Sequence, residues 1–304
     1  MRGKMPGLKA STRRTYADAL DHHVLPELGR YYVDAIRPAD IREWFAAKAE
    51  VYAPATVNGF LRVLKTMMAD ASEELDIPDP TRRIKAARQV GGPSTRRNML
   101  TADEMGSFLE VLRDEDSQWY AMVFTQFATA TRFGEVSALR WEDIDEQAGV
   151  IRIVRSHWRT IVDTTKTNEV RVVALTSELR DVLRWWRRKL LRAQDRQLHS
   201  GWIFPARTGK PHHAPSCMRP AFERALEVIN VDRRFSSHGL RRTANDLLRR
   251  VATGEVTRSI TGHATASMTD RYSHVETAEK ATAVTKMLKL VHDSGDQDGG
   301  GGAA

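Results

Sequence analysis

A small set of residues spread along the chain has the chemistry needed to act on a phosphodiester. In chain order the set is Arg132, Lys166, His238, Arg241, His263 and Tyr272. Two guanidiniums can grip the non-bridging oxygens of a phosphate bidentately, which an ammonium cannot match. Donors aimed at developing charge contribute roughly 2.7–4 kcal/mol each in measured cases. A lysine can protonate a leaving alkoxide, and a tyrosine can attack once cationic neighbours lower its pKa. The set therefore predicts breaking and rejoining of DNA strands.

Four short segments give these residues their context. They read TATRFGEVSALRWEDID (129–145), TTKTNEVRVVAL (164–175), HGLRRT (238–243) and GHATASMTDRYSH (262–274). Together they resemble the tyrosine recombinase (phage integrase) family. Its members carry an arginine in a T-x-R-x-x-E block, a lysine in a β-hairpin turn, a second arginine in H-x-L-R, and a G-H pair about nine residues before the nucleophilic tyrosine. The resemblance covers about residues 10–290.

The resemblance implies how the phosphate is bound and attacked. Arg132 and Arg241 would clamp it, and Tyr272 would form a 3′-phosphotyrosyl link with a free 5′-hydroxyl. Lys166 would be the general acid for the departing 5′ oxygen. The bond energy is conserved in such a link, so no metal and no ATP are expected as cofactors.

The remaining site residues have supporting roles in the same scheme. His238 and His263 would position the phosphate, and His238 can accept the tyrosine proton. Glu135 would hold a nearby guanidinium. Taken alone, each of these residues also has a structural interpretation, such as a surface arginine, a solvated turn lysine, a packed histidine or a core tyrosine.

The N-terminal part should supply a small helical domain. Ser11 or Thr12 is a candidate N-cap for a first helix, which the segment VLPELG (24–29) should break. Pro38 and Pro54 should open two further helices, because proline is favoured at the first helical position. Their apolar faces carry Ile41, Trp44 and Phe45 in one helix and residues from Val57 to Met68 in the other.

The second part mixes helices with a few strands. Thr101 and Glu104 should form a capping box, and the apolar stretch 119–130 predicts a buried helix. Residues 150–154 alternate like a strand, and two further runs, about 158–164 and 170–175, flank Lys166. We therefore expect Lys166 at or beside a hairpin tip. From Ser177 to about residue 291 the chain should be mainly helical. The basic run 184–196 is interpreted as an amphipathic helix with Trp185 or Trp186 in the core.

These elements predict a mainly α fold with a small antiparallel β-sheet, an α+β class. By the resemblance, a helical core-binding domain and a catalytic domain would form a clamp around DNA. The expected divisions are a basic N-terminal segment (1–10), a helical SAM-like core-type DNA-binding domain (11–90), a linker (91–98), a catalytic domain (99–292) and a disordered tail (293–304).

Composition limits the partners. The formal net charge is +8, which favours a polyanionic partner, and Arg96, Arg97 and Arg242 are candidate DNA-backbone contacts.

The one cysteine, Cys217, excludes a disulfide within the chain and is interpreted as a small apolar residue. The pairs His22-His23 and His212-His213 lack further ligands at metal spacing, so no metal site is expected. No membrane span or secretory signal is predicted. We expect a bacterial, cytoplasmic and nucleoid-associated protein.

The implied partner is double-stranded DNA, bound by a homotetramer on two DNA sites. The amphipathic segment 275–291 either folds onto its own domain or, as the resemblance implies, is exchanged with a neighbouring protomer. Accessory DNA-bending or excision factors would fit this scheme. The leading function is site-specific recombination for integration or excision of a mobile element. The alternatives are a Xer-like dimer-resolving recombinase, a type IB topoisomerase-like relaxer, and a DNA-binding regulator with an idle site.

Overall fold

A computed structural model describes residues 7–88, 98–115, 117–158, 161–165, 170–192, 200–206, 212–262 and 265. The chain divides into two compact units, Met1–Pro93 and Ser94–Ala304, and each has its own hydrophobic core. Residues 1–6 of the expected N-terminal segment, most of the linker with Arg96 and Arg97, the helix at 275–291 and the tail lie outside the described residues.

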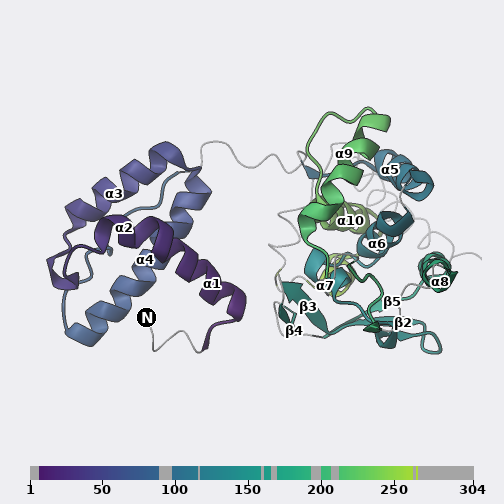
Figure 1. The fold of residues 1–304 in the computed structure, drawn as a ribbon, viewed down its shortest axis with the longest axis horizontal. Helices are drawn as coiled ribbons and strands as arrows, with labels where there is room; N and C mark the ends of the chain where they lie inside the picture. Colours follow the sequence, from purple (N-terminus) through teal and green to yellow (C-terminus); the bar gives the residue numbers. More distant parts are fainter. Residues whose placement is uncertain are drawn as a thin grey trace, which may run out of the picture. The chain divides into compact units, whose positions relative to one another are not determined.

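The first unit is built of helices (Figure 1). They are α1 (Ala10–Ala19), the π-helix η2 (Leu20–Val24), α2 (Leu25–Leu28), the 3-10 helix η3 (Val33–Ala35), α3 (Pro38–Val51) and α4 (Pro54–Leu75). Pro38 and Pro54 begin α3 and α4, as predicted. Ile41 and Trp44 of α3 pack with the apolar face of α4 in one core, and Phe45 packs against it from the edge.

The start and the continuation of the first helix were predicted wrongly. Lys9, not Ser11 or Thr12, is the N-cap of α1, and no side chain accepts a capping hydrogen bond there. The segment 24–29 does not break the helix, because a π-helical turn passes directly into α2. Pro26 lies in the first turn of α2, where no intrahelical N–H bond is required. The indole Nε1 of Trp44 donates to the His23 carbonyl at 2.7 Å, which stabilises the wide turn.

The second unit combines helices with strands, and in the view of Figure 1 the strands lie below α5, α6, α9 and α10. The helices are α5 (Ala102–Glu115), α6 (Ser117–Ala128), α7 (Phe133–Ser137), η5 (Trp141–Asp143), α8 (Ser177–Arg192), η7 (Pro215–Met218), α9 (Arg219–Val228), α10 (Ser237–Val251) and α11 (Gly254–Thr261). The predicted capping box is present at α5: Thr101 N donates to Glu104 Oε2 at 2.8 Å, and Glu104 N donates to Thr101 Oγ1 at 3.2 Å. Helix α6 is buried, as its apolar sequence predicted.

The strands form two small antiparallel sheets. They are β1 (Ile144–Asp145), β2 (Val150–Ile153), β3 (Arg155–Trp158), β4 (Ile161–Thr164) and β5 (Arg171–Ala174). One sheet has the order β1-β2-β5, and the other pairs β3 with β4. Ile151 lies opposite Val173, and Arg155 lies opposite Thr164.

The predicted hairpin around Lys166 is therefore wrong in its pairing. The two runs that flank Lys166 do not pair with each other; β4 pairs with β3, and β5 pairs with β2. Alternation identifies a strand but does not choose its partner. Burial determines that β5 pairs with β2, because this pairing places Val173 beside Ile151 in the core. Lys166 itself lies outside the described residues.

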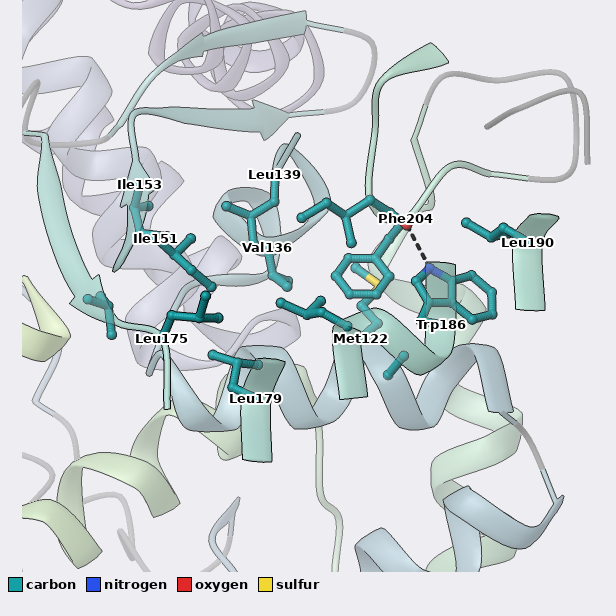
Figure 2. Packing of buried hydrophobic residues seen from close by; sticks show 14 residues of the cluster. Met122, Val136, Leu139, Ile151, Ile153, Leu175, Leu179, Trp186, Leu190 and Phe204 are labelled. Atoms are coloured by element: carbon teal, nitrogen blue, oxygen red, sulfur yellow. Dashed lines mark hydrogen bonds between the residues drawn. The ribbon is translucent and has the colours of Figure 1, made fainter. Parts of the chain in front are cut away.

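Helix α8 closes the core beside the first sheet (Figure 2). Trp186 is buried among Leu190, Phe204 and neighbouring aliphatic side chains, and its Nε1 donates to the Ile203 carbonyl at 2.7 Å, drawn as the dashed line. As far as Arg192, where the described part of the basic run ends, its residues lie on an amphipathic helix, as predicted. Cys217 in η7 is exposed. Within the described ranges no helix is both long and apolar enough to span a membrane.

Candidate active site

Arg132 is fixed by the short helix that follows it. Arg132 is the N-cap of α7, and Glu135 lies at the third helical position. The Glu135 carboxylate accepts from the Arg132 backbone N–H at 2.9 Å and from its Nη1 at 2.7 Å. The arginine side chain is 29% exposed while the glutamate is fully buried. A capping box therefore fixes both the backbone and the guanidinium of Arg132.

Glu135 binds a second arginine that the sequence analysis did not identify. Arg171 Nη2 lies 2.8 Å from Glu135 Oε2. Burial alone would raise the pKa of Glu135, but the charges and hydrogen bonds of Arg171 and Arg132 outweigh it and hold the pKa at about 2. The carboxylate is thus ionised at neutral pH and shared by two guanidiniums. The predicted contact between Glu135 and a nearby guanidinium is present.

Arg241 approaches from α10. Its side chain is almost fully buried, and Nη1 donates to the Ala130 carbonyl at 2.6 Å. Ala130 has a φ of 48°, in the left-handed region, so the chain turns sharply just before Arg132. The segment that carries Arg132 thereby also positions Arg241, although 109 positions separate them in sequence.

His238 lies one turn before Arg241 on the same helix face. Its side chain is exposed, at the wall of a cavity. Desolvation by the surrounding protein, followed by the charges of Arg242, Arg241 and Arg132, lowers the pKa of His238 to about 4. With a pKa of about 4, His238 is neutral at pH 7 in the free protein. The same turn of α10 packs too closely for a side chain at Gly239, because a Cβ there would lie 2.6 Å from the Phe235 ring.

Gln126 joins the two motif segments and was also missed from the sequence. This buried side chain of α6 donates through Nε2 to the Thr131 carbonyl at 3.2 Å and to the Ser237 carbonyl at 3.1 Å. Thr131 directly precedes Arg132, and Ser237 directly precedes His238. One amide thus fixes the spacing between the two segments. An isolated glutamine in an apolar helix carries no sequence signal for such a role.

A cavity of about 1180 Å³ lies over this arrangement. Arg132, His238, Arg241 and Gln126 line it together with residues of η7, α9 and the segment 230–237. Two guanidiniums and a neutral imidazole therefore face one volume. Such a group can bind a phosphate and stabilise charge on its non-bridging oxygens.

Three of the predicted site residues, Lys166, His263 and Tyr272, lie outside the described residues. Arg242 is half-buried and is not among the residues that line the cavity. The ring of His212 lies against that of His157 at a tilt of 36°, with ring centroids 4.1 Å apart, and His213 contacts Gln118 at 2.7 Å. Within the described part of the chain no cluster of three or more potential metal ligands is found.

Comparison with protein families decides the relationship. Residues 98–279 match the model described as the phage integrase family, and residues 2–48 match the phage integrase N-terminal SAM-like domain. The chain belongs to the phage integrase family. The resemblance read from the four motif segments is thereby confirmed.

Two curated proteins named as integrases match parts of the chain. A putative prophage phiRv2 integrase of Mycobacterium tuberculosis (strain H37Rv) is 27% identical over 158 residues, which is 50% of this chain and 40% of that protein. An integrase of Streptomyces ambofaciens is 25% identical over 246 residues, which is 74% of this chain and 61% of that protein. The chain thus spans about two fifths to three fifths of the length of these relatives.

Solved structures confirm the fold. The Tn1549 transposon integrase, determined with a circular intermediate DNA, has a TM-score of 0.73 at 19% identity, over 92% of this chain and 94% of that one. A lambda integrase dimer bound to a core site has a TM-score of 0.68 at 17% identity, over 88% and 89% of the two chains. The predicted class, mainly α with small antiparallel sheets, is therefore confirmed.

Proposed function

We propose that the protein is a site-specific tyrosine recombinase that cleaves and rejoins double-stranded DNA through a 3′-phosphotyrosyl intermediate. The observation that carries the proposal is the cavity that Arg132, His238 and Arg241 face together. The Glu135 and Ala130 contacts position the two guanidiniums before any substrate arrives. Pre-organised donors of this kind stabilise charge without reorganisation during the reaction.

The proposed reaction exchanges one phosphate ester for another. The Tyr272 oxygen attacks phosphorus and forms the new P–O bond, while the bond to the 5′ oxygen breaks. His238 accepts the phenol proton, which its neutral state permits. Lys166 donates a proton to the leaving 5′ oxygen, and His263 helps to position the phosphate. Because one ester replaces another, the reaction needs neither ATP nor a metal.

Integration or excision of a mobile element is the proposed context, since the curated relatives are named as integrases. Exchange between two duplexes requires two sites, so we propose a homotetramer with the two units of each protomer clamped around DNA. The segment 275–291 would be exchanged between protomers. Arg96, Arg97 and Arg242 would contact the DNA backbone, and accessory bending or excision factors would set the direction. Nucleoid association in a bacterial cytoplasm follows from this function.

Covalent capture tests the proposal. The wild type and Tyr272→Phe are expressed with DNA that flanks the native gene, denatured, and any attached DNA is sequenced. Attachment by the wild type alone, at one sequence, is the expected result. Attachment at scattered sequences would instead indicate a topoisomerase-like relaxer. A footprint by both proteins without attachment would indicate a DNA-binding regulator.

A further inference from the structure

Arg171 is an arginine with two side-chain hydrogen bonds, one of them to Glu135, and the proposed reaction does not use it. It lies on β5 opposite Ile153, with a side chain that is 10% exposed. Nη2 binds Glu135 Oε2 at 2.8 Å, and Nε donates to the Ile260 carbonyl at 3.1 Å. One guanidinium therefore connects the first sheet, the Glu135 carboxylate and the last turn of α11.

The contact with α11 extends to its end. Gly262 is the C-cap of α11 and has a φ of 64°, a left-handed conformation that glycine adopts without strain. A Cβ at Gly262 would lie 3.1 Å from Arg171 Cδ and 3.2 Å from its Nη1. The Arg171 side chain thus packs directly beneath the residue that precedes His263 in the sequence.

The contact with Glu135 leads to Arg132. The carboxylate accepts from Arg171 through Oε2 and from the Arg132 guanidinium through Oε1. A fully buried carboxylate is stable only while it is paired, and removal of one partner of a buried pair leaves an uncompensated charge. Without Arg171, Glu135 and hence Arg132 would lose the geometry that the two bonds fix.

We infer that Arg171 is a positioning residue for the proposed recombinase reaction, holding Arg132 through Glu135 and fixing the end of α11 beside it. The inference rests on the proposed function. Arg171 lies outside the cavity-lining set and acts through its neighbours, not on the phosphate. A lysine could replace its charge but not its simultaneous bonds to the carboxylate and to the Ile260 carbonyl.

The rate of covalent complex formation tests this role in the full chain, with a plasmid carrying the DNA that flanks the gene. Arg171→Ala is expected to lower that rate on the order of 100-fold while DNA affinity changes less than about twofold. Arg171→Lys should recover only part of the loss. The matched control is Arg152→Ala on the adjacent strand, whose guanidinium pairs with Asp145 at the surface at 2.7 Å. The control should keep the wild-type rate.

A double variant separates positioning from charge compensation. Arg171→Ala with Glu135→Gln removes both charges, so thermal stability should recover while the rate stays low. If thermal stability and the rate of covalent complex formation both recovered in the double variant, the inference would be overturned. It would also be overturned if Arg171→Ala formed the covalent complex at the wild-type rate per folded molecule.

A binding measurement decides the same question without catalysis. Inorganic phosphate is titrated into the wild type, Arg132→Ala, Arg171→Ala and their combination, with the His238 imidazole followed by NMR. If Arg171 acts through Arg132, both single variants weaken phosphate binding and the combination loses no more than Arg132→Ala alone. Additive losses, or an unaltered affinity in Arg171→Ala, would overturn the inference. Absence of covalent complex in the wild type would overturn the proposed function instead.

Discussion

At the scale of single residues, the main feature is the carboxylate of Glu135, which is ionised although it is buried away from water. Glu135 is fully buried, yet its pKa of about 2 lies below the ordinary glutamate value of 4.5, because burial, which raises the pKa, is outweighed by Arg171 and Arg132. The folded state therefore binds this proton less tightly than the unfolded chain. The contribution to stability is complete above pH 4.5 and is lost as the pH falls towards 2.

We therefore predict that Glu135→Gln flattens the acid limb of the stability curve. The wild type should lose about 2 kcal/mol more unfolding free energy between pH 7 and pH 3 than the variant does. Urea unfolding at several pH values measures this difference. Glu146→Gln is the control, because Glu146 forms an exposed pair with Arg184 and should change the slope little. Parallel curves for the wild type and Glu135→Gln would contradict the prediction.

His238 should couple DNA binding to protons. Its pKa of about 4 reflects desolvation and three nearby guanidinium charges, and a bound phosphate would offset those charges. The pKa should therefore rise on binding, so that DNA affinity increases as the pH falls from 7.5 towards 5.5. Titration of the imidazole by NMR with and without DNA measures the shift. A His238→Ala variant should lose that part of the pH dependence, and an unchanged imidazole pKa on binding would refute the coupling.

At the scale of elements, some local signals identified the structure, although the N-cap at Ser11 or Thr12 and the helix break at 24–29 were wrong, and the strand partners were not predicted. Proline at the start of α3 and α4 and the box at Thr101 and Glu104 act within one helical turn, so the sequence alone identifies them. The partners of β4 and β5 depend on which strand completes the core, which periodicity does not reveal.

The residues of the candidate site also fall into two groups, those with a local sequence signal and those that only long-range contacts identify. The four motif segments contain Arg132, Glu135, His238 and Arg241, each with a recognisable neighbourhood in sequence. Gln126 lies outside these segments and Arg171 lies inside the segment 164–175, but both act through bonds to residues 111 and 89 positions away, Ser237 and Ile260. Nothing in their immediate sequence distinguishes such contacts from an ordinary polar residue in a helix or strand.

The end of α4 offers a stability test at this scale. Asp76 is exposed and caps the helix with a φ of 52°, where a side chain is strained and a negative charge faces the negative end of the helix dipole. Asp76→Gly should raise the free energy of unfolding by about 1 kcal/mol. Glu73→Gly, an exposed position three residues earlier inside the helix, should lower it by about the same amount. Denaturant unfolding of both variants decides whether backbone conformation sets the sign.

At the scale of the whole molecule, the net charge of +8 can favour DNA binding only through cations that are exposed to the DNA phosphates. The segment that leaves the first unit is held in place along α4. Asn58 bonds both the N–H and the carbonyl of Ala87, and Lys65 donates to the Ile84 carbonyl at 2.8 Å. The segment carries four exposed cations, none with a carboxylate partner among the described residues: Arg82, Arg83, Lys85 and Arg88.

Because this segment is held along α4, we expect the four cations to contact DNA phosphates. The salt dependence of DNA binding tests this expectation. Each phosphate contact contributes about 0.9 to the slope of log affinity against log salt. Replacing all four by alanine should therefore reduce the slope by roughly 3 to 4. Asn58→Ala keeps every charge but frees the Ala87 backbone, so the slope should persist while affinity falls at all salt concentrations. Arg14→Ala with Arg37→Ala is the control, because Asp18 and Asp40 already pair with these arginines. An unaltered slope in the fourfold variant would mean that DNA is bound through other surfaces of the chain.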